Sequence, residues 1–186
     1  MMDENEMTPN VESATPAESA PAKTGRSKPR RDVRSPQNTR RHQARELALQ
    51  VLYEVDVTQH SSDEVLARAR AQHATPDDTF EYLALLVHGI QVDNEMIDRY
   101  ISAAAPAFPI AQLPPVDRNV LRVAIFELLN QKDVPPKAAI NEAIDLAKRY
   151  GGDNSGKFVN GVLGTVFSRI NAERPKSDDQ PATSTS

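Results

Sequence analysis

Apolar side chains recur every three or four residues through the central part of the sequence, and this spacing restricts the fold more than any other feature. After Pro115 it is kept by Val116, Val120, Leu121, Ala124, Ile125, Leu128 and Leu129. Such positions share one face of a helix, whereas a half-buried strand would need strict alternation of apolar and polar residues. Because no alternating stretch is present, the pattern predicts an all-α fold of about seven helices.

The same spacing predicts where the individual helices lie, with proline, glycine and small polar residues between them. The expected segments are 38–57, 62–72, 80–90, 96–101, one that begins at Pro114 or Pro115, one through 139–147, and one that begins at Asn154 or Ser155. We expect the third helix to pause near Gly89 or Asp93. We also expect Gly151 and Gly152 to allow a left-handed cap.

Both ends of the chain differ in composition from this central part. Residues 1–37 and 172–186 are rich in proline, serine, alanine and charge, and they have no apolar period. Such segments cannot bury enough apolar surface to offset the entropy lost on ordering. We therefore expect two disordered tails around a single helical domain at residues 38–171.

The net charge of −4 hides an uneven distribution of charge along the chain. Up to Ala22 every charged residue is acidic, and from Lys23 to Arg45 nine basic residues face a single acid, Asp32. A basic run that continues into a helix is typical of a binding site for a polyanion. A solvated charged linker would have the same composition, so both interpretations stay open.

The sequence has no cysteine, which excludes disulfides and thiolate metal sites and suits a reducing compartment. The first residues are acidic and lack the apolar core of a secretory signal. No apolar run approaches the roughly 20 residues that a membrane span requires. These features predict a soluble, cytoplasmic protein without a membrane partner.

The four histidines offer no sign of catalysis. His42, His60, His73 and His88 are not paired with other ligands at the spacing of a helical metal site. Ser61 and Ser62 follow His60, but catalytic triads are built from distant segments. We therefore expect no catalytic residue, no metal and no enzyme activity.

A glycine-rich segment before the last expected helix is similar to a phosphate-binding loop but is incomplete. Residues 151–157 fit the G-x-x-x-x-G-K pattern. The next residue is Phe158 rather than the serine or threonine that would hold Mg²⁺, and a helix rather than a strand precedes the loop. We therefore expect no nucleotide cofactor.

The same segment has properties that suit RNA. Free backbone N–H groups and the dipole at a helix start favour an anion, Lys157 adds a cation, and Phe158 adds a ring that could stack on a base. Alternatively, Lys157 is a solvated charge and Phe158 is a core residue on the same face as Val162. Tyr53 has the same ambiguity between a core ring and a ligand contact.

Several ordered motifs resemble the NusB family. They are Arg40–Glu46 with Leu52 and Tyr53, Val116–Arg122 with Glu127 and Leu128, Asp133–Pro135, Ile140–Ile144 with Ala147, Lys148, Tyr150 and Gly151, and Ser155 with Lys157–Leu163. The resemblance covers essentially the whole helical part. It implies two small helical bundles packed across each other, with a break near residues 106–114.

The resemblance also implies a function and a site. Members of the family bind boxA single-stranded RNA, together with the ribosomal protein NusE, and help RNA polymerase in an antitermination complex to read through terminators, notably in ribosomal RNA operons. The implied RNA-binding residues are Arg40, Arg41, His42, Arg45, Tyr53, Asp117, Arg118, Lys157 and Phe158. We expect the basic start of the first helix and the Lys157–Phe158 helix start to be brought together by the fold.

Two other functions compete with this hypothesis. A NusB-like domain also occurs fused to RNA methyltransferases, but we expect no such activity because no α/β domain with a glycine-rich cofactor loop follows the last helix. A helical module for protein interaction or dimerisation, without direct RNA binding, is the main alternative.

Overall fold

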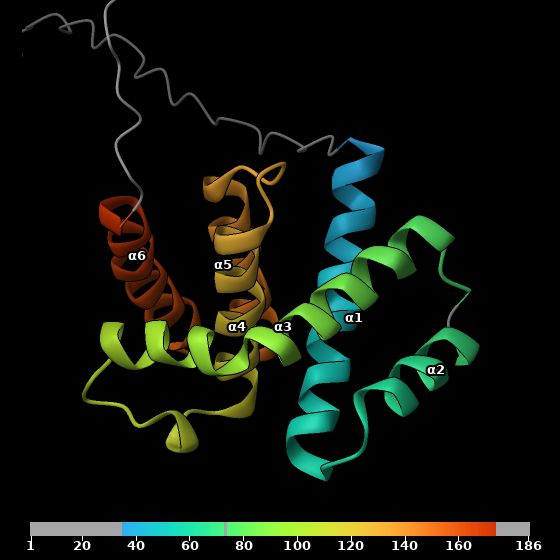
Figure 1. Cartoon of the computed structure of the whole chain (residues 1–186), viewed down its shortest axis with the longest axis horizontal. Coiled ribbons are helices and arrows are strands. Elements are labelled where there is room, and N and C mark those ends of the chain that lie inside the picture. Colours follow the sequence, from blue (N-terminus) through green and yellow to red (C-terminus); the bar gives the residue numbers. More distant parts are fainter. Residues whose placement is uncertain (1–34, 73, 174–186) are drawn as a thin grey trace, which may run out of the picture. The chain divides into compact units, whose positions relative to one another are not determined.

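A computed structural model describes residues 35–72 and 74–173. Over these residues the chain forms six α-helices, one short 3-10 helix and no strand (Figure 1). The elements are α1 (Pro36–Thr58), α2 (Ser62–Gln72), α3 (Asp77–Ala104), η1 (Ile110–Gln112), α4 (Pro115–Asn130), α5 (Pro136–Tyr150) and α6 (Ser155–Glu173). The predicted all-α fold is confirmed. Most of the two predicted tails, and His73, lie outside the described residues.

Capping and proline explain where α1, α4 and α5 begin. At the start of α1 the Ser35 hydroxyl accepts a hydrogen bond from the backbone N–H of Asn38 at 3.3 Å. Proline occupies the first turn of all three helices, where a missing N–H costs nothing. α1 ends at Thr58 and is followed by the capping residue Gln59, which takes the left-handed conformation with φ 62°. α1 therefore begins two residues before the predicted Asn38.

The structure corrects the expected pause in the third helix, because α3 runs without interruption through Gly89 and Asp93. A Cβ atom at Gly89 would lie 2.2 Å from Cζ of Phe126. Gly89 therefore does not end a helix but lets α3 approach α4 closely, and this packing offsets the low helix propensity of glycine. For this reason six α-helices are present rather than about seven.

The predicted left-handed cap at Gly151 is also wrong. Gly151 is extended, with φ −94° and ψ −170°. A Cβ atom there would lie 2.5 Å from Oγ of Ser155 and 2.7 Å from the carbonyl oxygen of Ala147. Glycine is needed at this position because of close contacts between the end of α5 and the start of α6, not because of its backbone conformation.

The helices pack in two groups that share a core. α1 packs against α2 and α3, and α4 packs against α5 and α6, while α1 and α3 both contact α4. Figure 1 shows α3 running across the direction of α1 and α4. The chain passes from one group to the other through residues 105–114, as the resemblance implies. The resulting arrangement fixes both ends of α1 and the start of α6, where the candidate site residues lie.

Candidate functional site

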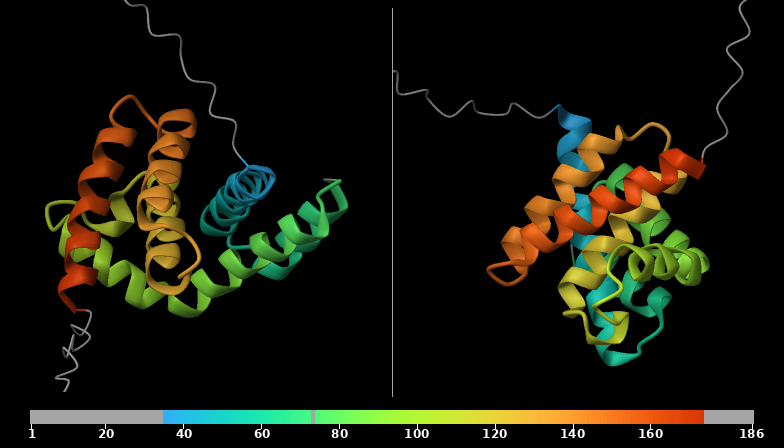
Figure 2. Two further views of the ribbon diagram at one scale, coloured as in Figure 1. Left: turned by 90° about the horizontal axis from the view of Figure 1, so that it is seen from above. Right: turned by 90° about the vertical axis from the view of Figure 1, so that its left-hand side faces the viewer.

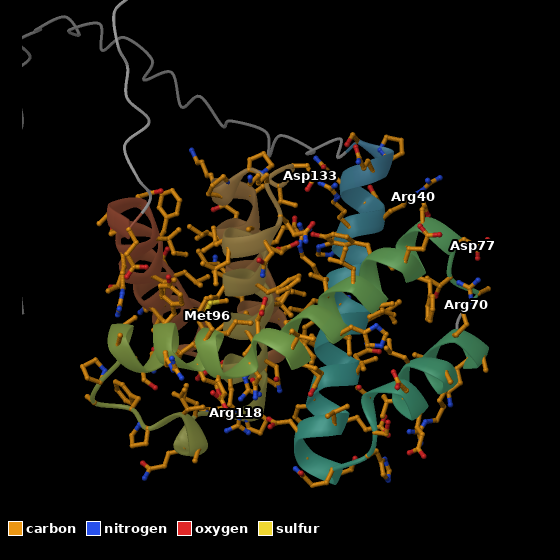
Figure 3. The ribbon with its side chains drawn as sticks, viewed as in Figure 1. Arg40, Arg70, Asp77, Met96, Arg118 and Asp133 are labelled. Carbon is orange, nitrogen blue, oxygen red and sulfur yellow. The ribbon has the colours of Figure 1, made fainter. Side chains whose placement is uncertain are left out.

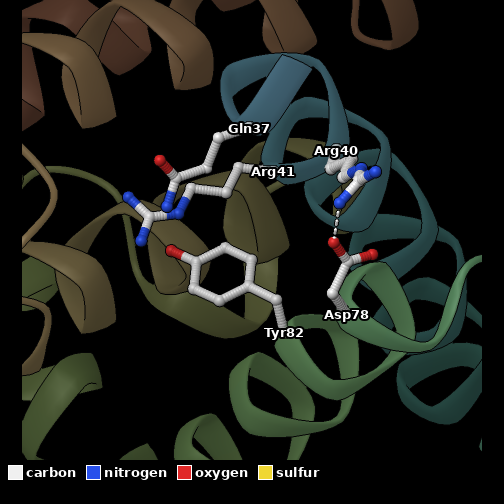
Figure 4. A pocket seen from close by; sticks show the side chains of 5 residues that line it. All are labelled: Gln37, Arg40, Arg41, Asp78 and Tyr82. Carbon is white, nitrogen blue, oxygen red and sulfur yellow. Dashed lines mark hydrogen bonds and ion pairs between the residues drawn. The ribbon is translucent and has the colours of Figure 1, made fainter. Parts of the chain in front are cut away.

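The N-terminal end of α1 presents two arginines beside a small cavity (Figure 4). The cavity has a volume of about 170 Å³ and is lined by Gln37, Arg40, Arg41, Asp78 and Tyr82. Arg40 forms an ion pair with Asp78 in the first turn of α3, and Arg41 forms one with Asp133 in the turn between α4 and α5. Both predicted arginines therefore lie at the surface, and each has a carboxylate partner.

Tyr82 supports this end of α1 from α3. The guanidinium carbon of Arg41 lies 5.3 Å from the centre of the Tyr82 ring, which is the geometry of a cation–π contact. The Tyr82 hydroxyl donates a hydrogen bond to Oε1 of Glu127. Burial and the neighbouring Glu127 carboxylate raise the pKa of Tyr82 above its ordinary value of 10.0. Tyr82 thus remains a neutral donor, with its ring under Arg41.

Arg45 has a different environment from the other two arginines and does not lie on the predicted surface. Only 4% of the residue is exposed. Its Nε donates to both carboxylate oxygens of Glu127, at 2.9 and 3.0 Å, and Nη2 lies 2.8 Å from Oε1. Burial alone would lower the pKa of Arg45, but Glu127, together with Tyr82 and Glu142, raises it above its ordinary value. The guanidinium of Arg45 is therefore a structural group that joins α1 to α4.

His42 lies next to this buried pair and is half-buried. Its Nδ1 lies 2.5 Å from Oε2 of Glu142, and its Nε2 lies 3.6 Å from Oε1 of Glu46. The Glu46 carboxylate also accepts hydrogen bonds from Arg149 at 2.6 Å and from Tyr150 at 3.0 Å. His42 therefore links α1 to α5.

Asp117 and Arg118 lie near the opposite end of α1. Nη2 of Arg118 donates to Oδ2 of Asp56 at 2.5 Å, and Nη1 donates to the carbonyl oxygen of Ile110 at 2.9 Å. Asp117 is buried, and its Oδ1 has no hydrogen-bond partner in the part of the chain that the structure describes. Asp56 follows Arg40 by 16 residues, which corresponds to about 24 Å along the helix axis. Figure 3 shows Arg118 well away from Arg40.

Tyr53 lies in a groove of its own. Its side chain is 43% exposed. The groove has a volume of about 480 Å³, and its lining includes the apolar or aromatic residues Leu49, Tyr53, Val57, Val116 and Tyr150. Tyr53 is therefore neither a core ring nor a neighbour of Arg40 and Arg41. It belongs to a largely apolar surface.

The start of α6 combines a cation with an aromatic pair. Lys157 is exposed and has no ion-pair partner among residues 35–72 and 74–173. Phe158 is half-buried against the core, and its ring meets that of Phe108 edge to face, with the ring centres 5.5 Å apart at an angle of 71°. Phe158 therefore packs on the core while part of its side chain stays at the surface.

The fold does not bring the two helix starts into contact. Arg40 and Arg41 contact residues of α3 and of the α4–α5 turn, whereas Phe158 contacts Phe108 in the α3–α4 connection. Both views in Figure 2 show the first turn of α1 apart from the first turn of α6. The candidate surface thus consists of two regions: the arginine region (Gln37, Arg40, Arg41 and Tyr82) and the aromatic region (Phe108, Lys157 and Phe158).

The sequence did not predict Tyr82 and Phe108 of these regions, nor Asp78 and Asp133, the partners of the two arginines. Phe108 carried a usable signal, because a large aromatic ring between Pro106 and Pro109 has no apolar period to explain it. It is 54% exposed in the structure. The other three gave no local signal, since their partners are distant in sequence.

Two further observations concern metals and membranes. Over the described ranges 35–72 and 74–173, no group of three or more His, Cys, Asp or Glu side chains is placed to hold a metal ion. None of the helices in these ranges is long and apolar enough to cross a membrane.

Comparison with known proteins identifies relatives of this chain. A model of the NusB family matches residues 42–168. The transcription antitermination protein NusB of Chloroflexus aggregans is 47% identical over 143 residues, which are 76% of this chain and 95% of the relative. NusB of T. maritima has a TM-score of 0.66 at 35% identity, covering 69% of this chain and 90% of that one. A structure of the antitermination factors NusB and NusE in complex with dsRNA gives 0.65 at 31% identity, covering 70% and 98%.

The match extends over most of the described helices, from the second turn of α1 to the last turns of α6. Nearly the whole length of the Chloroflexus relative is covered at an identity well above that needed to share a fold. The chain therefore belongs to the NusB family.

Proposed function

We propose that the protein is a non-enzymatic transcription antitermination factor that acts in the cytoplasm. It binds boxA-type single-stranded RNA together with the ribosomal protein NusE and promotes read-through by RNA polymerase, notably in ribosomal RNA operons. The observation that carries the proposal is family membership over nearly the full length of a relative that bears this function in its name. A structural neighbour that holds NusB, NusE and RNA supports it.

In this proposal the arginine region captures the RNA backbone. A guanidinium presents a planar set of donors that matches phosphate oxygens, and its charge is permanent. Arg40 and Arg41 are consecutive residues of α1 that point to different sides of the helix, toward Asp78 and Asp133, so they can bind two phosphates of one strand. His42, the residue after Arg41 in α1, adds a ring whose nitrogens face Glu142 and Glu46 in the free protein.

The aromatic region binds bases in the same RNA. Stacking on an aromatic ring contributes about 1–3 kcal/mol per base and tolerates any base. Phe158 and the more exposed Phe108 meet edge to face, so one base can lie against both rings. Lys157 is close enough in sequence to bind the adjoining phosphate.

The groove around Tyr53 suits a protein partner better than an RNA. It is mostly apolar, and it lies where α1, α4 and the end of α5 meet. Aromatic residues in such surfaces often dominate the free energy of protein association. We therefore assign this groove to NusE and assign structural roles to Arg45, Asp117 and Arg118. The same groove is the feature that favours the alternative function, a module for protein interaction or dimerisation alone.

A salt series of RNA binding tests the proposal and separates it from this alternative. The full-length protein is titrated into labelled boxA-like single-stranded RNA and into an RNA duplex of the same sequence, with and without NusE. We expect the single strand to bind more tightly, the affinity to fall steeply with salt, and NusE to strengthen binding. Equal affinity for an unrelated RNA in the presence of NusE, or no binding at all, would overturn the proposal.

A pair of variants tests the two regions in the same assay. Arg41→Gln combined with Phe158→Leu removes one charge and one ring, while Arg99→Gln removes one charge from an exposed position on α3 that is 80% accessible. We expect the first variant to bind boxA-like RNA weakly and the second to bind it like the wild type.

A further inference from the structure

Both arginines of the arginine region are already bound to carboxylates in the RNA-free protein. Arg40 is paired with Asp78 and Arg41 with Asp133 (Figure 4 shows the first pair). The two acids come from different parts of the fold, the first turn of α3 and the turn between α4 and α5. Two neighbouring cations of a phosphate site are therefore each matched by an anion of the protein itself.

These ion pairs contribute little to the stability of the fold. The side chains of Asp78 and Asp133 are 49% and 62% exposed, and those of Arg40 and Arg41 are 54% and 19% exposed, so water reaches the carboxylate of each pair and screens it. The pair between Arg45 and Glu127 is the contrast, because its side chains are only 5% and 1% exposed and it ties two helices together in the core. The exposed pairs can open without disturbing the packing of α1, whereas the buried pair cannot.

A carboxylate and a phosphate compete for the same donors of a guanidinium. Both accept charge-assisted hydrogen bonds from the Nη groups, so a phosphate that takes the place of Asp78 or Asp133 restores the bonds that are broken. Asp78 also keeps a favourable environment after release, since it lies in the first turn of α3, where the helix dipole favours a negative charge. The exchange therefore leaves the arginine paired and Asp78 near the positive end of a helix, while Asp133, which is 62% exposed, returns to water.

We propose that Asp78 and Asp133 set the affinity of the protein for RNA: they hold Arg40 and Arg41 in the free protein and give them up to RNA phosphates on binding. The two acids act as internal competitors. They weaken the attraction of this surface for any polyanion. An RNA that also makes the base contacts binds tightly enough to displace them. This inference rests on the proposed RNA-binding function.

The test is a gain of affinity, which an unfolded variant cannot produce. Asp78→Asn, Asp133→Asn and the double variant are titrated, as full-length proteins, into boxA-like single-stranded RNA at several salt concentrations. We expect each substitution to lower the Kd by about two- to fivefold at low salt, and less at high salt. Glu95→Gln is the matched control, because it removes the same charge from a carboxylate that is 90% exposed on the outer part of α3. It should leave the Kd unchanged.

A double-mutant cycle shows whether the effect passes through the paired arginine. In an Arg40→Gln background, Asp78→Asn should no longer improve binding, because the arginine that it frees is absent. An undiminished gain in that background would overturn the exchange in favour of a general charge effect.

Unchanged or weaker binding by Asp78→Asn and Asp133→Asn would also overturn the inference, since the acids would then hold the arginines in the position that RNA needs. If the wild type itself binds no RNA, the proposed function fails, and this inference fails with it. If the wild type binds and only the aspartate variants behave otherwise than expected, this inference alone is wrong.

Discussion

The arginine region at the start of α1 and the aromatic region at the start of α6 differ in whether their charged side chains already have partners within the protein. The arginines at α1 are held by carboxylates and supported by the Tyr82 ring, so their charge is largely matched before any ligand arrives. At α6, Lys157 has no ion-pair partner among the described residues, and Phe158 shares its ring surface with Phe108. We infer that Arg40, Arg41 and Lys157 control how salt affects binding, and that the rings of Phe108 and Phe158 supply contacts that depend little on salt.

The largest expected effect concerns the third arginine of α1, which resembles the other two in sequence but not in structure. Arg45→Met leaves the Glu127 carboxylate buried without its cation, and we expect a loss of about 3–5 kcal/mol in the free energy of unfolding. Urea denaturation followed by circular dichroism measures it. Arg40→Met is the control and should change this free energy little. A stably folded Arg45→Met protein that fails to bind RNA would contradict this and indicate that Arg45 binds the RNA.

The next effect concerns the arginine region itself. Arg40→Gln with Arg41→Gln should weaken boxA-like RNA binding by roughly 2 kcal/mol, because two charge-assisted contacts are lost and part of the loss is offset by the aspartates that they leave. The slope of log K against log salt should become shallower by about 1.4, the value for two phosphates of a single strand. An unchanged slope would mean that these arginines do not bind phosphates.

The aromatic region should respond differently to substitution. Phe158→Leu keeps apolar packing against the core but removes the stacking surface, so we expect a loss of about 1 kcal/mol in RNA binding with an unchanged salt slope. Thermal unfolding of the same variant shows whether the core is intact. A change in the slope without a change in stability would contradict the division of roles between the two regions.

The smallest expected effect concerns the hydroxyl of Tyr82. Tyr82→Phe keeps the ring under Arg41 but removes a donor to Glu127, so we expect a loss of about 1 kcal/mol in the free energy of unfolding and little change in RNA binding.

Tyr82 also gives the wild type a pH dependence that the variant lacks. Because the pKa of Tyr82 is higher in the folded state than its ordinary value of 10.0, its contribution is complete below that pH and is lost as the pH rises further. The stability difference between wild type and Tyr82→Phe should therefore shrink in alkaline solution. A difference that stays constant up to the unfolding pH of the wild type would contradict the assignment.

Most of the fold followed from local patterns. α2 covers the predicted residues 62–72, and prolines mark the starts of α4 and α5 as expected. The pause and the cap that the structure corrects both involve a glycine. A side chain at Gly89 would collide with Phe126 of α4, and one at Gly151 would collide with Ser155 of α6. These contacts between elements require glycine, and no local pattern predicts them.

Less of the candidate site could be predicted, for a related reason. Arg40, Arg41 and Arg45 are equivalent in a sequence, because each is a basic residue near the start of one helix. Their environments differ through Asp78, Asp133 and Glu127, which follow them by 38, 92 and 82 residues. In the aromatic region, Phe108 lies 50 residues before Phe158, and the two rings meet because the α3–α4 connection contacts the start of α6. No local pattern predicts this contact.

A map of where the RNA lies on the protein tests the site of two regions most directly. A boxA-like RNA that carries 4-thiouridine is crosslinked to the full-length protein in the presence of NusE, and the modified peptides are identified by mass spectrometry. We expect crosslinks at both regions, around residues 37–42 of α1 and around Phe108 or Phe158, and none on the outer part of α3 near Glu95. Crosslinks confined to one region, or centred on the groove around Tyr53, would contradict it.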